Sequence, residues 1–190
     1  MANSTEIRIS DPELTETITR LDGNTPGTAA GYDLAGLGDV NGDGLSDFAV
    51  ATPNDDALTP ASVTVIFGRS DGWPETVDLG SVAEPEGFTI RGLSVMQYWQ
   101  DLPVAAAGDV NGDGIGDMIV GDYPNDRAYV LFGRDDGFGN SIDLAVLSPD
   151  QGVVLQGRSG SYAGFSVDGA GDVNGDGHDD LIIGAWRDAG

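Results

Sequence analysis

The sequence contains no cysteine and no lysine, and its only histidine is His178. Without cysteine, no disulfide can crosslink the fold, so bound metal ions are the expected substitute. The side chains that most often serve as catalytic nucleophiles and bases are therefore scarce. Ser159 and Ser161 lie in a Gly/Ser turn, and no base partner is identifiable for either. We predict that the chain is not an enzyme, with a carboxylate pair for glycoside hydrolysis as the catalytic alternative.

Positive charge and long apolar runs are also scarce. Eight Arg stand against 32 Asp and Glu, which gives a net charge of −24. Such acidity argues against nucleic-acid and anionic-membrane partners, and it suits a saline or calcium-rich setting in which self-repulsion is screened. No apolar run approaches the roughly 20 residues of a membrane span, so we predict no membrane insertion. Residues 1–4 lead into a polar stretch without a visible leader, so we expect an excised piece if the natural protein is exported.

A nine-residue phrase occurs three times, at residues 39–47, 109–117 and 172–180. Each copy begins Asp-Val-Asn-Gly-Asp-Gly and ends in Asp, so oxygen-bearing side chains recur at positions 1, 3, 5 and 9. This is the ligand spacing of a calcium loop, in which Gly at position 6 permits the tight turn and position 7 offers its carbonyl. Three copies disfavour a metal-free Asx-rich turn. Magnesium is less suitable because it requires a tighter octahedron.

The segments after these loops predict strands rather than helices. Position 12 is Val50, Val120 or Ile183, where an EF-hand requires a bidentate Glu. Each loop is followed by a short apolar run, mostly of β-branched residues, as in a strand buried on both faces. The loops are therefore predicted to lie in a β-protein, and an EF-hand is excluded.

The repeat extends well beyond the loops, and one unit takes about 63–70 residues. A β-like run ending in Gly precedes each loop, and the runs at 63–69 and 128–134 lead to Asp-Gly turns. Four short strands per unit, separated by turn signals, predict an all-β fold of propeller blades, which are four-stranded antiparallel sheets. We place the units at about 18–87, 88–152 and, truncated, 153–190, with residues 1–17 as the tail of a preceding unit.

The phrases resemble the FG-GAP repeat of integrin alpha-subunit β-propellers and of their bacterial relatives. Residues 164–165 match the first part of that repeat and residues 184–185 the last, with the calcium-loop phrase between them. Pro53 and Pro124 stand where the repeat ends, and Trp186 replaces this proline in the third copy. The resemblance covers nearly the whole chain.

This resemblance implies three structural Ca²⁺ ions, one in each loop. Side chains at positions 1, 3, 5 and 9 and the carbonyl at position 7 would hold each ion. The implied ligands are Asp39, Asn41, Asp43, Leu45, Asp47, Asp109, Asn111, Asp113, Ile115, Asp117, Asp172, Asn174, Asp176, His178 and Asp180. The side chain of His178 would be a solvated loop side chain.

The resemblance also implies an extracellular module for adhesion or ligand binding, with a protein or glycan partner. The alternatives are a carbohydrate-binding or substrate-binding propeller module attached to an enzyme, and a structural repeat without a ligand. Trp73, Tyr98 and Trp99 are candidate contact residues, although packing between blades explains them equally well. Arg69 and Arg134 occupy equivalent turns, which favours a structural role for both.

Propellers of this family resemble closed rings of seven blades, which need more than twice this length. Two full units and part of a third would form an open arc with exposed apolar faces and strand edges. The chain is therefore expected to be a fragment, or to form a homo-oligomer in which the N-terminal strands of one copy complete the last blade of the next.

Overall fold

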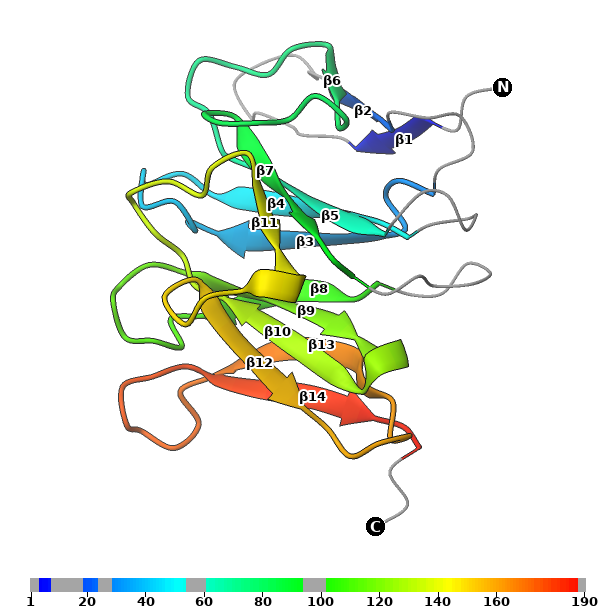
Figure 1. Ribbon diagram of the computed structural model, residues 1–190. Helices are drawn as coiled ribbons and strands as arrows, with labels where there is room; N and C mark the ends of the chain where they lie inside the picture. Colours follow the sequence, from blue (N-terminus) through cyan, green and yellow to red (C-terminus); the bar gives the residue numbers. More distant parts are fainter. Residues whose placement is uncertain (1–3, 8–18, 24–28, 54–60, 94–101, 188–190) are drawn as a thin grey trace.

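The computed structural model describes residues 4–7, 19–23, 29–53, 61–93 and 102–187 (Figure 1). Within these ranges the chain is nearly all β-strand, with two single-turn 3-10 helices, η1 (Tyr123–Asn125) and η2 (Leu144–Val146). The all-β prediction is confirmed. No helix in the described ranges is long and apolar enough to cross a membrane.

Two complete blades lie in the middle of the chain, each with four antiparallel strands in the same order, and the sheet of the first blade has a fifth strand at its edge. In each blade the loop phrase closes the hairpin between the first two strands. The first blade consists of β3 (Asp33–Gly38), β4 (Asp47–Thr52), β5 (Ser62–Ile66) and β7 (Gly87–Arg91). The second consists of β8 (Val104–Gly108), β9 (Asp117–Asp122), β10 (Arg127–Leu131) and β12 (Gly152–Gln156).

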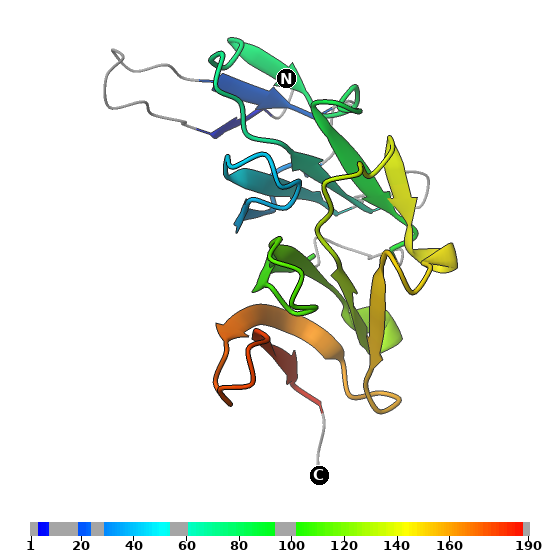
Figure 2. The ribbon, with the colours of Figure 1, turned by 90° about the vertical axis from the view of Figure 1, so that its left-hand side faces the viewer.

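Partial sheets flank these two blades on either side. On the N-terminal side, β1 (Ser4–Ile7), β2 (Thr19–Asp22) and β6 (Thr76–Asp78) form one sheet. On the C-terminal side, β13 (Ala163–Gly171) and β14 (Asp180–Ala185) form a hairpin. The four sheets follow one another in a row (Figures 1 and 2).

The outer edge of a blade receives a strand from further along the chain. β11 (Ser141–Asp143) follows β10 in sequence, yet it pairs in parallel with β7 of the first blade. β6 pairs in parallel with β2 in the same manner. The sheets thus combine strands from adjacent sequence units, since β7 falls inside the unit placed at about 88–152. The unit boundaries at about 87/88 and 152/153 therefore stay a prediction from the sequence.

The apolar core lies between neighbouring sheets rather than inside one of them. All six residues of β9 are buried, because this strand lies in a sheet that is covered on both faces. On one face, Met118 packs in the cluster that holds Phe88 and Val104; on the other, Ile119 packs with Val167. This burial explains why the strands after the first two loops are apolar at nearly every position.

Candidate metal-binding loops

The three loop phrases fold into the same turn. Glycines at position 4 of the phrase have φ angles of +76°, +78° and +77°, and those at position 6 have +86°, +89° and +91°. Side chains rarely adopt these left-handed values, so glycine is the residue that both positions favour. All three loops lie at the left of Figure 1 and face the viewer in Figure 2. The predicted recurrence of one loop is therefore present in the backbone.

Aspartate at position 1 organises each turn by accepting main-chain hydrogen bonds. Asp39 Oδ1 accepts from the amides of Gly42, at 2.7 Å, and Asp43, at 3.1 Å, while Oδ2 accepts from Gly44 at 2.8 Å. Asp109 and Asp172 make the corresponding bonds. The amide at position 6 of the third loop is the main reason why the pKa of Asp172 is lowered.

Positions 3 and 5 bond to each other in the first two loops. Asn41 Oδ1 accepts from the Asp43 amide at 3.0 Å, and Asn41 Nδ2 donates to Asp43 Oδ2 at 3.0 Å. The second loop repeats this pair between the equivalent residues. The third loop keeps the main-chain bond, since Asn174 Oδ1 accepts from the Asp176 amide at 2.8 Å, but Asn174 Nδ2 donates to Asp180 Oδ1 at 3.3 Å instead.

Aspartate at position 9 connects each of the first two loops to the end of the third strand of its blade. Asp117 is fully buried; its Oδ2 accepts from the Val110 amide at 2.8 Å and its Oδ1 from the Gly133 amide at 2.8 Å. Asp47 is 2% exposed and accepts from the equivalent amides of Val40 and Gly68. Burial raises the pKa of both carboxyls, and these hydrogen bonds oppose the rise.

Neighbouring loops contact one another, although no single phrase of the sequence predicts such a contact. The Asp179 amide donates to the Asp109 carbonyl at 3.0 Å, and Asp179 Oδ2 accepts from the Asp109 amide at 2.8 Å. The ring of His178 lies against Gly112, and its Nδ1 is 3.1 Å from the Val110 carbonyl oxygen. A Cβ on Gly112 would be 2.6 Å from the ring. The glycine at position 4 does not signal this contact, because its positive φ already favours glycine in all three phrases.

The predicted ligands lie close together along the chain, but their side chains face main-chain amides and one another. No group of three or more His, Cys, Asp and Glu side chains is arranged to hold a metal ion anywhere in the described ranges, which include every predicted ligand. The donor set nevertheless has the right chemistry, because it consists of carboxylate and amide oxygens, which calcium prefers. A carboxylate oxygen that accepts one amide also keeps acceptor capacity.

The other residues singled out in the sequence have varied surroundings. Trp73 is half-buried, with its ring 5.6 Å from that of Phe48, and it lines a cavity of about 400 Å³. Arg69 pairs with Asp71 at 2.7 Å, whereas Arg134 donates to the Asp150 carbonyl at 2.6 Å. The two arginines therefore make different contacts, although their turns are equivalent. The candidates Tyr98 and Trp99 lie outside the described residues.

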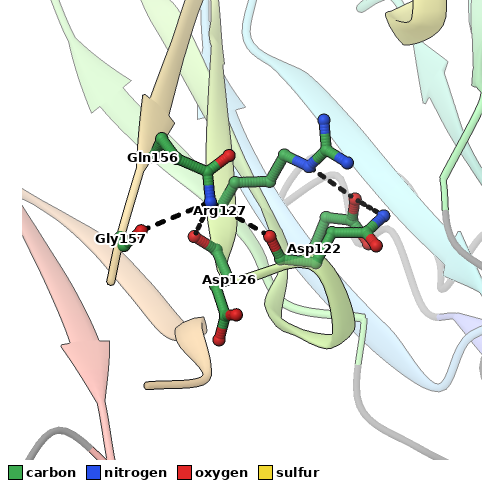
Figure 3. Close-up of polar contacts among 6 residues, drawn as sticks. Asp122, Asp126, Arg127, Gln156 and Gly157 are labelled. Atoms are coloured by element: carbon green, nitrogen blue, oxygen red, sulfur yellow. Dashed lines mark hydrogen bonds and ion pairs between the residues drawn. The ribbon is translucent and has the colours of Figure 1, made fainter. Parts of the chain in front are cut away.

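A buried carboxyl group lies at the end of β9, within a network of polar contacts (Figure 3). Asp122 is fully buried and lies 3.5 Å from Nε of Arg127. Gln156 Nε2 donates to the carbonyls of Asp126, at 2.9 Å, and Gly157, at 3.3 Å. These bonds connect the turn between β9 and β10 to the end of β12, so the network stabilises the blade.

The chain is similar in sequence to integrin alpha subunits of several animals. Over 176 residues the chain is 28% identical to "Integrin alpha-PS2" of Drosophila melanogaster, a match that covers 89% of the chain and 12% of the relative. It is 28% identical over 180 residues to "Integrin alpha-IIb" of Mus musculus, covering 88% of the chain and 16% of the relative. It is 37% identical over 89 residues to "Integrin alpha pat-2" of Caenorhabditis elegans, covering 44% of the chain and 7% of the relative. The chain therefore spans only a small part of these proteins. No family model matches it.

Proposed function

Since this chain resembles integrin alpha subunits over most of its length, as its repeats predict, we propose that it is a calcium-binding propeller module of an extracellular adhesion protein. Its role is binding rather than catalysis. The observation that carries the proposal is one loop conformation built three times, each time with the same oxygen donors and at the same place in a hairpin.

Calcium suits these loops because they concentrate negative charge along one side of the row of sheets (Figure 1). The first two phrases carry three carboxylates each and the third carries four, and each loop contacts the next. A divalent cation in each loop would offset this repulsion and would hold together the two strands that the loop joins. Positions 1, 3, 5 and 9 would supply side-chain oxygens, and Leu45, Ile115 and His178 their carbonyls.

The test is calorimetric titration of the chelator-treated chain with Ca²⁺, and separately with Mg²⁺. We expect up to three sites that prefer Ca²⁺. Asp43→Ala, Asp113→Ala and Asp176→Ala should each weaken one site and lower the melting temperature in calcium, because a ligand bound only to the folded state stabilises it. Asp136→Ala, an exposed carboxylate outside the loops, is the matched control. Unchanged binding and melting in all three loop variants would refute the proposal.

For the adhesion role we propose a protein partner, which the similarity to integrins supports. A small polar ligand is the second candidate, and the cavity of about 400 Å³ lined by Trp73, Arg69 and Glu86 favours it. Glycan-array binding that is lost in both Trp73→Ala and Glu86→Gln would support this second function and a carbohydrate-binding module. A glycan signal that persists in both variants would exclude this cavity as its source.

A further inference from the structure

The second and third loops meet at the backbone of Asp109, the first residue of the second phrase. The amide of Asp179, at position 8 of the third phrase, donates to the Asp109 carbonyl at 3.0 Å. The Asp179 carboxylate accepts in return from the Asp109 amide, at 2.8 Å from Oδ2. One residue of the third repeat thus holds the peptide groups on both sides of the Asp109 Cα, which fixes the backbone there.

The backbone of Asp109 is important because the side chain of this residue organises the second loop. Its carboxylate accepts from the amides of Gly112, Asp113 and Gly114 at 2.7, 3.0 and 2.8 Å. The same carboxylate is the first predicted calcium ligand of that loop. Ligands bind a metal best when the groups around them hold them in a fixed orientation. Asp179 therefore lies where a neighbouring repeat can act on the second calcium site.

A glycine at the end of β8 makes room for the Asp179 carboxylate. A Cβ on Gly108 would clash with this carboxylate. Gly38 ends β3 in the same manner, with a φ of +73° against +77° at Gly108. At Gly38, however, no atom of the described residues lies within 4 Å of the corresponding Cβ position. The space that Asp179 occupies between the second and third loops is thus open between the first and second.

This space is open because position 8 of the second phrase is glycine. The Gly116 amide donates to the Asp39 carbonyl at 3.0 Å, just as the Asp179 amide donates to that of Asp109. Gly116 has no carboxylate to return the bond. The two junctions therefore share one main-chain hydrogen bond and differ in one side chain, which provides a matched comparison within the molecule.

We propose that Asp179 is a positioning residue for the second calcium site, although it belongs to the third loop and is not one of the predicted ligands. This inference rests on the proposed calcium function. The second loop supplies the oxygen donors, and the third loop holds the first of them in place. His178 contacts the second loop from the same side, with its Nδ1 3.1 Å from the Val110 carbonyl oxygen.

The first test measures each site separately by NMR titration of the chelator-treated chain with Ca²⁺. The amides of Gly44, Gly114 and Gly177, at position 6 of each phrase, report one loop each. Asp179→Ala should weaken calcium binding about tenfold at the second loop and leave the first loop unchanged. Asp179→Asn keeps an oxygen that can accept from the Asp109 amide, so it should restore most of the affinity.

Two results of this titration would overturn the proposal. An unchanged second loop in Asp179→Ala would show that the contact does not act on the site. Equal losses in Asp179→Ala and Asp179→Asn would show that only the negative charge matters. Circular dichroism checks that both variants fold.

The second test transfers the contact to the first junction. A Cβ on Gly116 would lie 3.1 Å from the Asp39 carbonyl oxygen, and Gly116 does not have a left-handed φ, so a side chain requires only a small shift. Gly116→Asp should tighten calcium binding at the first loop several-fold, because its carboxylate can accept from the Asp39 amide. Gly116→Ala is the matched control without an acceptor. Equal affinities in the two variants would contradict the proposal.

Hydrogen exchange in chelator tests the contact without calcium. The Asp109 amide should exchange several-fold faster in Asp179→Ala than in the unmodified chain, because its acceptor has been removed. An unchanged rate would overturn the inference whatever the calcium affinity of the chain. If the unmodified chain shows no calcium response at any loop, the proposed function is refuted, and the inference with it.

Discussion

The first two loops and the third share a six-residue sequence and a backbone turn, yet they differ at the aspartate that ends the phrase. Asp47 and Asp117 are buried, and each accepts an amide from the segment that follows the third strand of its blade. Asp180 is partly exposed, and its Oδ1 accepts from Asn174 instead. Local sequence therefore determines the turn, while the neighbouring strands determine the burial and bonding of its last carboxylate.

The largest expected effect comes from removing this carboxylate where it is buried. Asp117→Ala leaves the amides of Val110 and Gly133 without an acceptor, so we expect it to lower the free energy of unfolding by about 3 kcal/mol. Asp180→Ala should cost less, about 1 kcal/mol, since water can replace its bonds at a partly exposed site. Urea denaturation in chelator measures both values without any contribution from bound metal. Equal losses would show that burial does not distinguish the loops.

Substitution of the glycines at position 4 of the phrase should lower the free energy of unfolding by a smaller amount. In Gly175→Ala only the left-handed backbone is penalised, because no atom lies within 4 Å of the added Cβ. This should cost about 1 kcal/mol. Gly112→Ala carries the same penalty and also displaces the His178 ring from Val110, for about 0.5 kcal/mol more. Thermal melts of both variants give the difference.

The matching control combines Gly112→Ala with His178→Ala. If the ring is the cause of the additional loss, the cost of Gly112→Ala should fall to that of Gly175→Ala in the His178→Ala background. An unchanged cost would mean that the contact between loops contributes nothing to stability.

The smallest expected effect is on the pH dependence of the free energy of unfolding. Burial raises the pKa of Asp117, so its contribution to stability is complete below the ordinary value of 3.8 and is lost as pH rises through the raised value. Main-chain amides lower the pKa of Asp172, so its contribution is present above 3.8 and is lost as pH falls through the lowered value. Comparing the free energy of unfolding at neutral and acidic pH, in chelator, we expect Asp117→Asn and Asp172→Asn to change the acid dependence in opposite directions. A change in the same direction would contradict this account.

The sequence was informative where one residue type satisfies a local requirement. Gly44, Gly114 and Gly177 all have the left-handed φ expected of position 6, and the apolar run after each loop forms a strand. Contacts between repeats were not predictable in this way. The exchange of β7 and β11 between units, and the packing of His178 on Gly112, depend on how sheets stack, which no single repeat encodes. Asp47 and Asp117 also accept from amides beyond their own phrases, at Gly68 and Gly133, which the phrase alone does not predict.

The parallel pairing of β11 with β7, and of β6 with β2, has a mechanical consequence. Each of these short strands lies in the connection between the third and fourth strands of one blade, yet it is hydrogen-bonded to the outer edge of the sheet before it. Opening one sheet therefore removes a strand from its neighbour and exposes that neighbour's edge. Repeats coupled in this manner lose their independence, so the chain should unfold cooperatively rather than sheet by sheet.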